Sequence, residues 1–182
     1  MDRVAVFIDG SNLYRGLVST LGTDYRLDFV AFISALAAGR PLLRAYYYNA
    51  PLPNEDPAAK AHQSFLNYLK RAPYVTVRLG RLERRGEGFV EKGVDIQIAI
   101  DMLRLAYADA YDVAVLVSGD GDFAEVLRVI QDMGKQAENT TFQVLSSYRL
   151  AQQADKYYPL DELPWERLRA KGAESVAFPF PD

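Results

Sequence analysis

Runs of consecutive apolar residues alternate along the chain with stretches in which apolar residues recur every three or four positions. Two of the runs, Val4 to Ile8 and Val113 to Val117, contain no polar residue. Strands buried on both faces have this composition, because helices cover both sides of a parallel sheet. The intervening stretches have the spacing of amphipathic helices. The pattern predicts an α/β fold, with a doubly wound, mainly parallel sheet in a three-layer arrangement.

Weaker patterns extend the predicted sheet. Leu42 to Tyr48 indicates a strand, and the alternation over residues 75–79 indicates another with one polar face. Further along, Phe142 to Leu145 is predicted to form the next strand. A helix over Ser147 to Asp155 and a closing strand or extended segment over Tyr157 to Leu163 complete the fold.

An arginine-rich segment follows the strand at residues 75–79. Its alternating pattern and the glycines at Gly86 and Gly88 predict a β-hairpin inserted into the sheet topology. Two interpretations are open for Arg81, Arg84 and Arg85. They belong either to a solvated hairpin with cross-strand ion pairs, or to a flap that lays its arginines on a phosphate backbone.

The length of 182 residues suits one domain. We assign residues 1–163 to this domain. Residues 164–182 contain three prolines and are expected to form a C-terminal tail or a short helix packed on the outside.

Composition narrows the possible functions. The chain has no cysteine, which favours a reducing cytoplasm, and neither a signal peptide nor a membrane span is expected. A net charge of -3 argues against bulk electrostatic binding of nucleic acid, so such binding would need a local basic patch. The single histidine, His62, is expected at the surface and argues against histidine-based zinc chemistry.

Acidic residues follow both fully apolar runs. Asp9 comes directly after the first, and Asp120 and Asp122 lie in a glycine-containing turn after the second. Ligand sites in open α/β sheets lie at this carboxyl end of the strands. Two carboxylates so close together would repel each other unless a cation lay between them.

A further acid, Asp95, opens the most apolar predicted helix, where the helix dipole favours negative charge whether or not the acid binds a ligand. Asp101 lies about 120° around this helix from Asp95, so the two acids do not share a face. We therefore expect Asp95 to join the site. Asp101 is expected to cap, form a pair or face solvent.

The acidic turn also has simpler interpretations. Asp and Gly are ordinary turn residues, and Asp122 could cap the following helix. Residues 119–124 also fit a loose dinucleotide-binding pattern, but two acids would repel a pyrophosphate there. A phosphatase of the haloacid dehalogenase type needs a second Asp two residues after the first, where this chain has Ser11.

Three segments together resemble the NYN domain of the LabA-like group, a branch of the PIN-like nuclease superfamily. They are Phe7 to Tyr14, Lys92 to Asp95 with Asp101 to Leu103, and Ser118 to Phe123. The match in order and spacing extends over roughly residues 3–160. One departure is the polar stretch Gln136 to Thr141, where relatives place a short apolar strand.

The resemblance implies a PIN-like, Rossmann-like fold and a metal-dependent ribonuclease that hydrolyses RNA phosphodiester bonds. Mg²⁺ or Mn²⁺ would be held at the carboxyl edge of the sheet. The residues suggest the same cofactor, because carboxylates without histidine suit these hard cations better than zinc. The expected metal ligands are Asp9, Asp95, Asp120 and Asp122.

Other residues are given supporting roles in the same site. Asn12 is expected to hydrogen-bond the attacking water or a phosphate oxygen. Ser118 is expected to orient Asp120 without contacting the metal itself, and it is also counted among the substrate-binding residues. Lys92 would meet a substrate phosphate, with Arg81, Arg84 and Arg85 as further substrate contacts.

A non-catalytic alternative also fits the sequence. An NYN module could keep these acids as a structural metal or partner site and act as an RNA-binding or protein-binding regulatory component. The expected partner is single-stranded or structured RNA, no membrane is expected, and only the non-catalytic module would bind a protein instead. The sequence leaves open whether the chain forms a homodimer.

Overall fold

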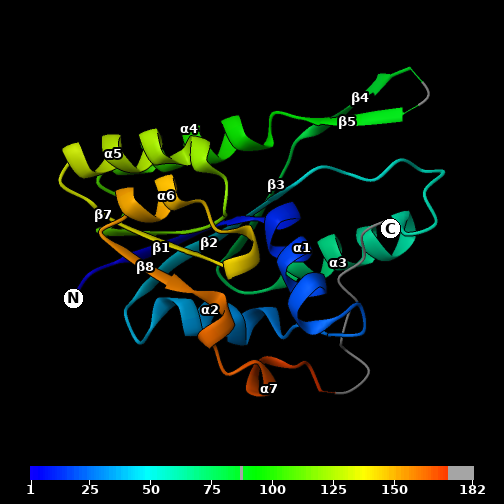
Figure 1. Ribbon diagram of the computed structural model, residues 1–182, viewed down its shortest axis with the longest axis horizontal. Coiled ribbons are helices and arrows are strands. Elements are labelled where there is room, and N and C mark those ends of the chain that lie inside the picture. Colours follow the sequence, from blue (N-terminus) through cyan, green and yellow to red (C-terminus); the bar gives the residue numbers. More distant parts are fainter. Residues whose placement is uncertain (87, 172–182) are drawn as a thin grey trace.

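The computed structural model describes residues 1–86 and 88–171. Its centre is a six-stranded sheet in the order β3-β2-β1-β6-β7-β8 (Figure 1). All neighbouring strands run parallel. The strands are β1 (Val4–Asp9), β2 (Leu42–Asn49), β3 (Val75–Leu79), β6 (Val113–Val117), β7 (Gln136–Thr141) and β8 (Lys156–Pro159).

Helices cover both faces of the sheet, which confirms the predicted three-layer α/β architecture. On one face lie α4 (Val94–Tyr107), α5 (Ala124–Asp132) and α6 (Tyr148–Gln153). On the other lie α1 (Gly10–Leu21), α2 (Phe29–Ala37), α3 (Ala59–Arg71) and α7 (Trp165–Leu168) (Figure 1). Three short 3-10 helices are η1 (Gly121–Phe123), η2 (Gln143–Leu145) and η3 (Leu160–Glu162). No helix in the described residues is long and apolar enough to cross a membrane.

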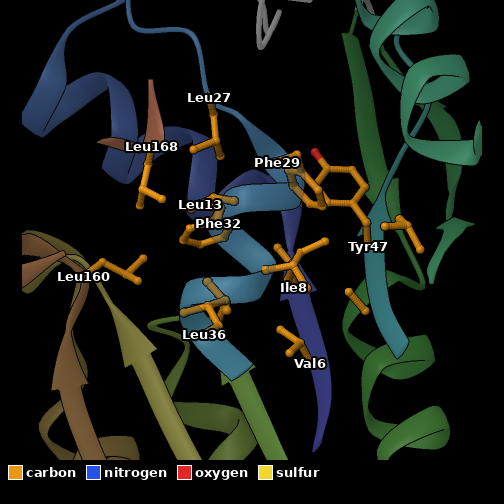
Figure 2. Packing of buried hydrophobic residues seen from close by; sticks show 14 of the residues in the cluster. Val6, Ile8, Leu13, Leu27, Phe29, Phe32, Leu36, Tyr47, Leu160 and Leu168 are labelled. Carbon is orange, nitrogen blue, oxygen red and sulfur yellow. The ribbon is translucent and has the colours of Figure 1, made fainter. Parts of the chain in front are cut away.

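The two faces of β1 belong to two separate hydrophobic layers. Val6 and Ile8 pack toward α2, with Phe29, Tyr47 and neighbouring side chains around them (Figure 2). Phe7 points to the other layer, beneath α4 and α5. The alternation follows from the two-residue period of a strand. Burial on both faces explains why the β1 run needs no polar residue.

The predicted strand over Phe142 to Leu145 is wrong. The fifth strand of the sheet is instead β7, formed by the polar stretch Gln136–Thr141, and Gln143–Leu145 forms η2. Polar side chains are tolerated in this buried strand because they are hydrogen-bonded. Asn139 Nδ2 donates to the carbonyl oxygens of Leu116 and Ser118 at 3.1 and 2.9 Å.

The predicted hairpin is confirmed. β4 (Arg81–Arg85) and β5 (Gly88–Lys92) form a separate antiparallel pair that projects beyond the body of the molecule (Figure 1). The hairpin leads directly from the edge strand β3 into α4. It therefore lies at the same edge of the sheet as the start of α4.

Part of the segment expected to pack on the outside belongs to the core. The Trp165 ring stacks on Phe142 with ring centroids 5.3 Å apart, and the Tyr25 hydroxyl donates to the Trp165 carbonyl at 2.5 Å. The remainder of the predicted tail, residues 172–182, lies outside the described residues. A domain boundary at residue 163 stays a prediction.

His62 is buried, whereas the sequence predicts a surface position for it. It lies on the inner face of α3 with Phe65, Leu66 and Leu69. Burial lowers the pKa of its imidazole, which favours the neutral form. His62 thus takes an apolar position that the helical pattern alone does not reveal.

Candidate active site

The carboxyl ends of β1 and β6 bring the first acidic residue and a serine together. The two strands pair in register up to Ile8 and Val117, so Asp9 and Ser118 follow at adjacent strand ends. Asp9 caps α1, because its Oδ1 accepts a hydrogen bond from the Asn12 backbone N–H at 3.0 Å. Its Oδ2 accepts from the Ser118 hydroxyl, also at 3.0 Å. The buried Asp9 carboxylate is therefore fixed from both sides.

The acidic turn after β6 is hydrogen-bonded to the same serine. Ser118 Oγ accepts from the Asp120 backbone N–H at 3.2 Å, and Asp120 Oδ1 accepts from the Asp122 N–H at 2.9 Å. The residue that caps η1 is therefore Asp120, and no side chain among the described residues caps α5, so the simpler interpretation of Asp122 as a helix cap does not hold. The Asp122 side chain is exposed.

Asp95 completes the group from the first turn of α4. Burial raises the pKa of its carboxyl, and the negative charges of Asp120 and Asp122 raise it further. The pKa of Asp9 is raised by burial and, to a smaller extent, by the charge of Asp95, while the hydrogen bonds from Asn12 and Ser118 oppose the shift. Asp95 thus lies within range of the charges of the other three acids, which come from two other chain segments.

Asp101 is directed elsewhere. The Tyr48 hydroxyl donates to Asp101 Oδ2 at 3.0 Å, and Arg104 donates to Asp101 Oδ1 at the same distance. Arg78 lies 3.4 Å from the same carboxylate. This pairing is one of the roles expected for Asp101.

Glu91 also approaches the acidic group, although sequence reasoning did not assign it to the site. The Ser11 hydroxyl donates to Glu91 Oε2 at 3.3 Å and joins the hairpin to the start of α1. Burial raises the pKa of Glu91, and the charges of Asp9 and Asp95 add to the shift. No local signal identifies Glu91, because the contact spans 80 residues and depends on how the hairpin folds back.

Arg15 is a second residue that the sequence reasoning missed. Its positive charge lowers the pKa of both Asp9 and Glu91, against the larger effect of burial. The side chain is exposed on α1, one helical turn after Ser11. Residues four apart on a helix lie on the same face, so the position of Arg15 after Ser11 could have placed it near the acids from the sequence.

Apart from Ser118, the residues predicted to contact the substrate lie in two places, on α1 next to Asp9 and on the β4–β5 hairpin. Asn12 is buried, and its Oδ1 accepts from the Thr141 hydroxyl at 3.0 Å. Lys92 ends β5, three residues before Asp95, and is half-buried. The side chains of Arg81, Arg84 and Arg85 are exposed on the projecting hairpin, where Arg81 pairs with Glu83 at 3.3 Å.

The carboxylate oxygens of the four acids suit a hard divalent cation, but they do not form a complete coordination site by themselves. Within residues 1–86 and 88–171, no three His, Cys, Asp or Glu side chains are grouped closely enough to hold a metal ion. Mg²⁺ commonly keeps several waters and uses only one or two protein carboxylates together with substrate phosphates. The chemistry of the four carboxylates therefore fits Mg²⁺ or Mn²⁺, with water and substrate as further ligands.

Comparisons with known proteins find a relative in sequence and a neighbour in fold. Over 172 residues the chain is 28% identical to the low amplitude and bright protein LabA of Synechococcus elongatus, covering 88% of this chain and 85% of LabA. The fold is similar to the crystal structure of a protein of unknown function from Vibrio parahaemolyticus, with a TM-score of 0.70 and 23% identity. That match covers 88% of this chain and 94% of the other.

A family model matches most of the sequence. The model of the NYN domain matches residues 3–161, which include every strand of the central sheet and all four acids of the site. The chain therefore belongs to the NYN domain family.

Proposed function

We propose that this protein is a Mg²⁺- or Mn²⁺-dependent endoribonuclease that hydrolyses RNA phosphodiester bonds beside Asp9, Asp95, Asp120 and Asp122. Membership of the NYN family suggests nuclease-type hydrolysis at the level of the PIN-like superfamily. The observation that carries the proposal is the convergence of these carboxylates from three segments: burial raises the pKa of Asp9 and Asp95, and the negative charge of neighbouring acids adds to both shifts. Such a group of like charges is expected where a cation binds.

The four carboxylates differ in how firmly they are held. Asp9 would be the fixed ligand, because Asn12 and Ser118 hold both of its oxygens while further lone pairs remain for a cation. The exposed Asp122 can rotate toward a bound ion or substrate. When bound, the ion would lower the pKa of a coordinated water and offset the charge that develops on the attacked phosphate.

Substrate binding would use positive and amide groups around the acids. With Oδ1 of Asn12 held by Thr141, its amide hydrogens can donate to a phosphate oxygen. Lys92 and Arg15 lie near the acids and can offset the charge of an approaching phosphate. The exposed hairpin arginines would contact the RNA backbone at a greater distance from the cleaved bond.

One observation favours a non-catalytic role as the second candidate. Among the residues that the structure describes, no group of three possible ligands is ready to hold a metal ion. A protein of this kind would bind RNA or a protein partner without cleaving RNA.

A cleavage assay separates the two functions. Labelled single-stranded and hairpin RNAs are incubated with the protein in Mn²⁺, Mg²⁺ or EDTA, and products are resolved by electrophoresis. Cleavage that needs the metal and is lost in Asp9→Asn, but retained in the surface variant Asp24→Asn, supports the nuclease. RNA binding without cleavage under any condition supports the non-catalytic alternative.

A further inference from the structure

Two large hydrophobic side chains are exposed just beyond the end of β7. Val144 in η2 is 65% exposed and Tyr148, the first residue of α6, is 80% exposed. Both lie in the segment for which the sequence predicts a strand and the helix after it. Their exposure leaves a hydrophobic and aromatic surface without a role in the fold.

This surface is attached to the acidic turn by close backbone packing. A Cβ atom at Gly119 would lie 1.9 Å from the Leu145 carbonyl oxygen, and one at Gly121 would lie 2.7 Å from Ser147 Oγ. Side chains at these two positions would therefore displace residues 145–147. The glycines on either side of Asp120 allow the segment that carries Val144 and Tyr148 to rest directly on the acidic turn.

The segment that carries Val144 and Tyr148 is fixed at both ends by contacts with the rest of the fold. Ser147 Oγ caps α6 by accepting from the Leu150 N–H at 3.4 Å, and the Leu150 side chain is fully buried. At the other end of the segment, the buried Phe142 stacks on Trp165. Binding to a surface held in this way costs less ordering entropy than binding to a loop that must first fold.

The sheet order places three types of side chain in a row along one edge. The arginine hairpin follows β3, the acids follow β1 and β6, and Val144 and Tyr148 follow β7. Arg149, beside Tyr148, adds a positive charge that acts on Glu125 at the start of α5. An RNA strand lying along this edge would meet phosphate contacts, then the cleavage site, then an exposed aromatic ring.

We infer that Tyr148, with the exposed Val144 in the same segment, is a stacking platform for an unpaired RNA base next to the Asp120–Asp122 turn. The inference rests on the proposed function and specifies its substrate as RNA that is single-stranded on this side of the cleaved bond. Aromatic rings bind unpaired bases of any sequence, because every base presents a π-face. A paired base already stacks on its neighbours and gains little from the platform.

Tyr107 provides a matched control. It is 87% exposed, but it ends α4, whereas Asp95 lies at the start of the same helix. The two ends of this helix of 14 residues are about 20 Å apart at 1.5 Å per residue. Removing the Tyr107 ring therefore removes a similar exposed side chain far from the acids.

The test measures RNA binding in EDTA, where metal-dependent cleavage is off. Fluorescence anisotropy gives the Kd of a labelled single-stranded oligonucleotide and of a duplex with the same sequence, for the wild type, Tyr148→Ala, Tyr148→Phe and Tyr107→Ala. We expect Tyr148→Ala to weaken single-strand binding about fivefold or more, and to leave duplex binding and the salt dependence unchanged. Tyr148→Phe should retain wild-type affinity, because it keeps the ring.

Equal Kd values for the wild type and Tyr148→Ala on the single strand would overturn the inference. So would a similar loss on the duplex or in Tyr107→Ala, since neither reflects stacking at this platform. Cleavage measured separately with Mn²⁺ keeps the two proposals distinct. Binding that depends on Tyr148 without any cleavage would overturn the nuclease and leave the platform intact, and cleavage with Tyr148-independent binding would do the reverse.

Discussion

Ser118 donates a 3.0 Å hydrogen bond to Asp9 Oδ2 and joins two strand ends that are 109 residues apart in the sequence. The same hydroxyl accepts from the Asp120 backbone N–H. The sequence predicts that Ser118 orients Asp120. In the structure its hydroxyl contacts Asp120 through the main chain, and it also holds the Asp9 carboxylate. Because Ser118 is fully buried, its hydroxyl is committed to these two contacts.

Replacing Ser118 by alanine should therefore affect the metal site through Asp9. The buried Asp9 carboxylate would lose one of its two donors, which typically costs about 1–3 kcal/mol of unfolding free energy. A lost hydrogen bond to a metal ligand typically weakens metal binding about 10- to 100-fold. Urea denaturation in EDTA measures the first effect and a Mn²⁺ titration the second. Ser19→Ala, on the exposed side of α1, is the control, and an unchanged Mn²⁺ affinity in Ser118→Ala would contradict this role.

The acids themselves should be needed for turnover. Asp9→Asn, Asp120→Asn and Asp122→Asn should each reduce Mn²⁺-dependent cleavage to the background rate, because an amide cannot supply the negative charge that holds a divalent cation. Asparagine can still cap a helix, so Asp9→Asn and Asp120→Asn should keep the fold. Circular dichroism checks the fold and gel assays check cleavage. Normal turnover by Asp9→Asn would exclude the proposed site.

The hairpin arginines should contribute binding that is independent of RNA sequence. Replacing Arg81, Arg84 and Arg85 with Gln should weaken RNA binding about equally across sequences. The slope of log K against log salt should become shallower by up to about 2, at roughly 0.7 per phosphate contact on a single strand. Titrations at several salt concentrations measure this slope.

A triple variant of α3 tests whether any loss of charge has the same effect. Lys60, Lys70 and Arg71 are exposed and carry the same total charge as the three hairpin arginines. Their replacement by Gln should leave the slope nearly unchanged. An unchanged slope in the hairpin variant as well would support the interpretation of a solvated hairpin.

The central part of the site is predictable because it follows the strongest patterns in the sequence. Val4 to Ile8 and Val113 to Val117 are continuous apolar runs, and this pattern alone places Asp9 and Asp120 at strand ends. Parallel strands bring their carboxyl ends to one edge. The helix period likewise separates Asp95 from Asp101, whose carboxylate pairs with Arg104 and Arg78.

The strand β7 could not be predicted from apolar periodicity, because its buried residues other than Ala137 are polar and paired. Thr140 Oγ1 donates to the Tyr158 carbonyl at 2.7 Å, and Glu138 pairs with Arg40 at 2.7 Å. Every such partner is distant in the sequence. A pattern of polar residues indicates a buried strand only when these partners are known.

The contact of Glu91 with Ser11 could not be predicted either, because it also joins residues that are distant in the sequence. Alternation identifies the hairpin, but it carries no information on the direction in which the hairpin leans relative to α1. That direction decides whether Glu91 comes close to Ser11 and the acids. Tertiary structure therefore supplies a fifth carboxylate near the group, in addition to the four that the sequence places at strand and helix ends.

Metal binding should change thermal stability in a pH-dependent way. The folded-state pKa values of Asp9 and Asp95 lie above their ordinary values, so in the absence of metal their ionised forms cost stability at neutral pH. That cost is lost as the pH falls through the raised folded-state pKa. A bound cation offsets the repulsion at neutral pH, but it competes with protons at low pH. Millimolar Mn²⁺ should therefore raise Tm more at pH 7.5 than at pH 5.

The expected size of this shift follows from mass action. A ligand at 100 times its Kd adds about 2.7 kcal/mol, and each kcal/mol raises Tm by about 2–4 °C in a protein of this length. Scanning fluorimetry in EDTA and in Mn²⁺ at both pH values measures it. An equal Tm gain at pH 5 and pH 7.5 would show that the ion binds without competing with protons at these carboxylates.

The same measurement on Asp122→Asn shows whether Asp122 is a metal ligand or a structural residue. The charge of Asp122 contributes to the raised pKa of Asp95, and the residue that caps η1 is Asp120. Removing this charge should therefore leave Tm in EDTA no lower than in the wild type, and should abolish most of the Mn²⁺ response. Asp24→Asn, in an exposed turn, should keep both values. If Asp122→Asn keeps the full Mn²⁺ shift, Asp122 does not belong to the site, and the fixed carboxylate of Asp9 with Asp95 and Asp120 must account for metal binding.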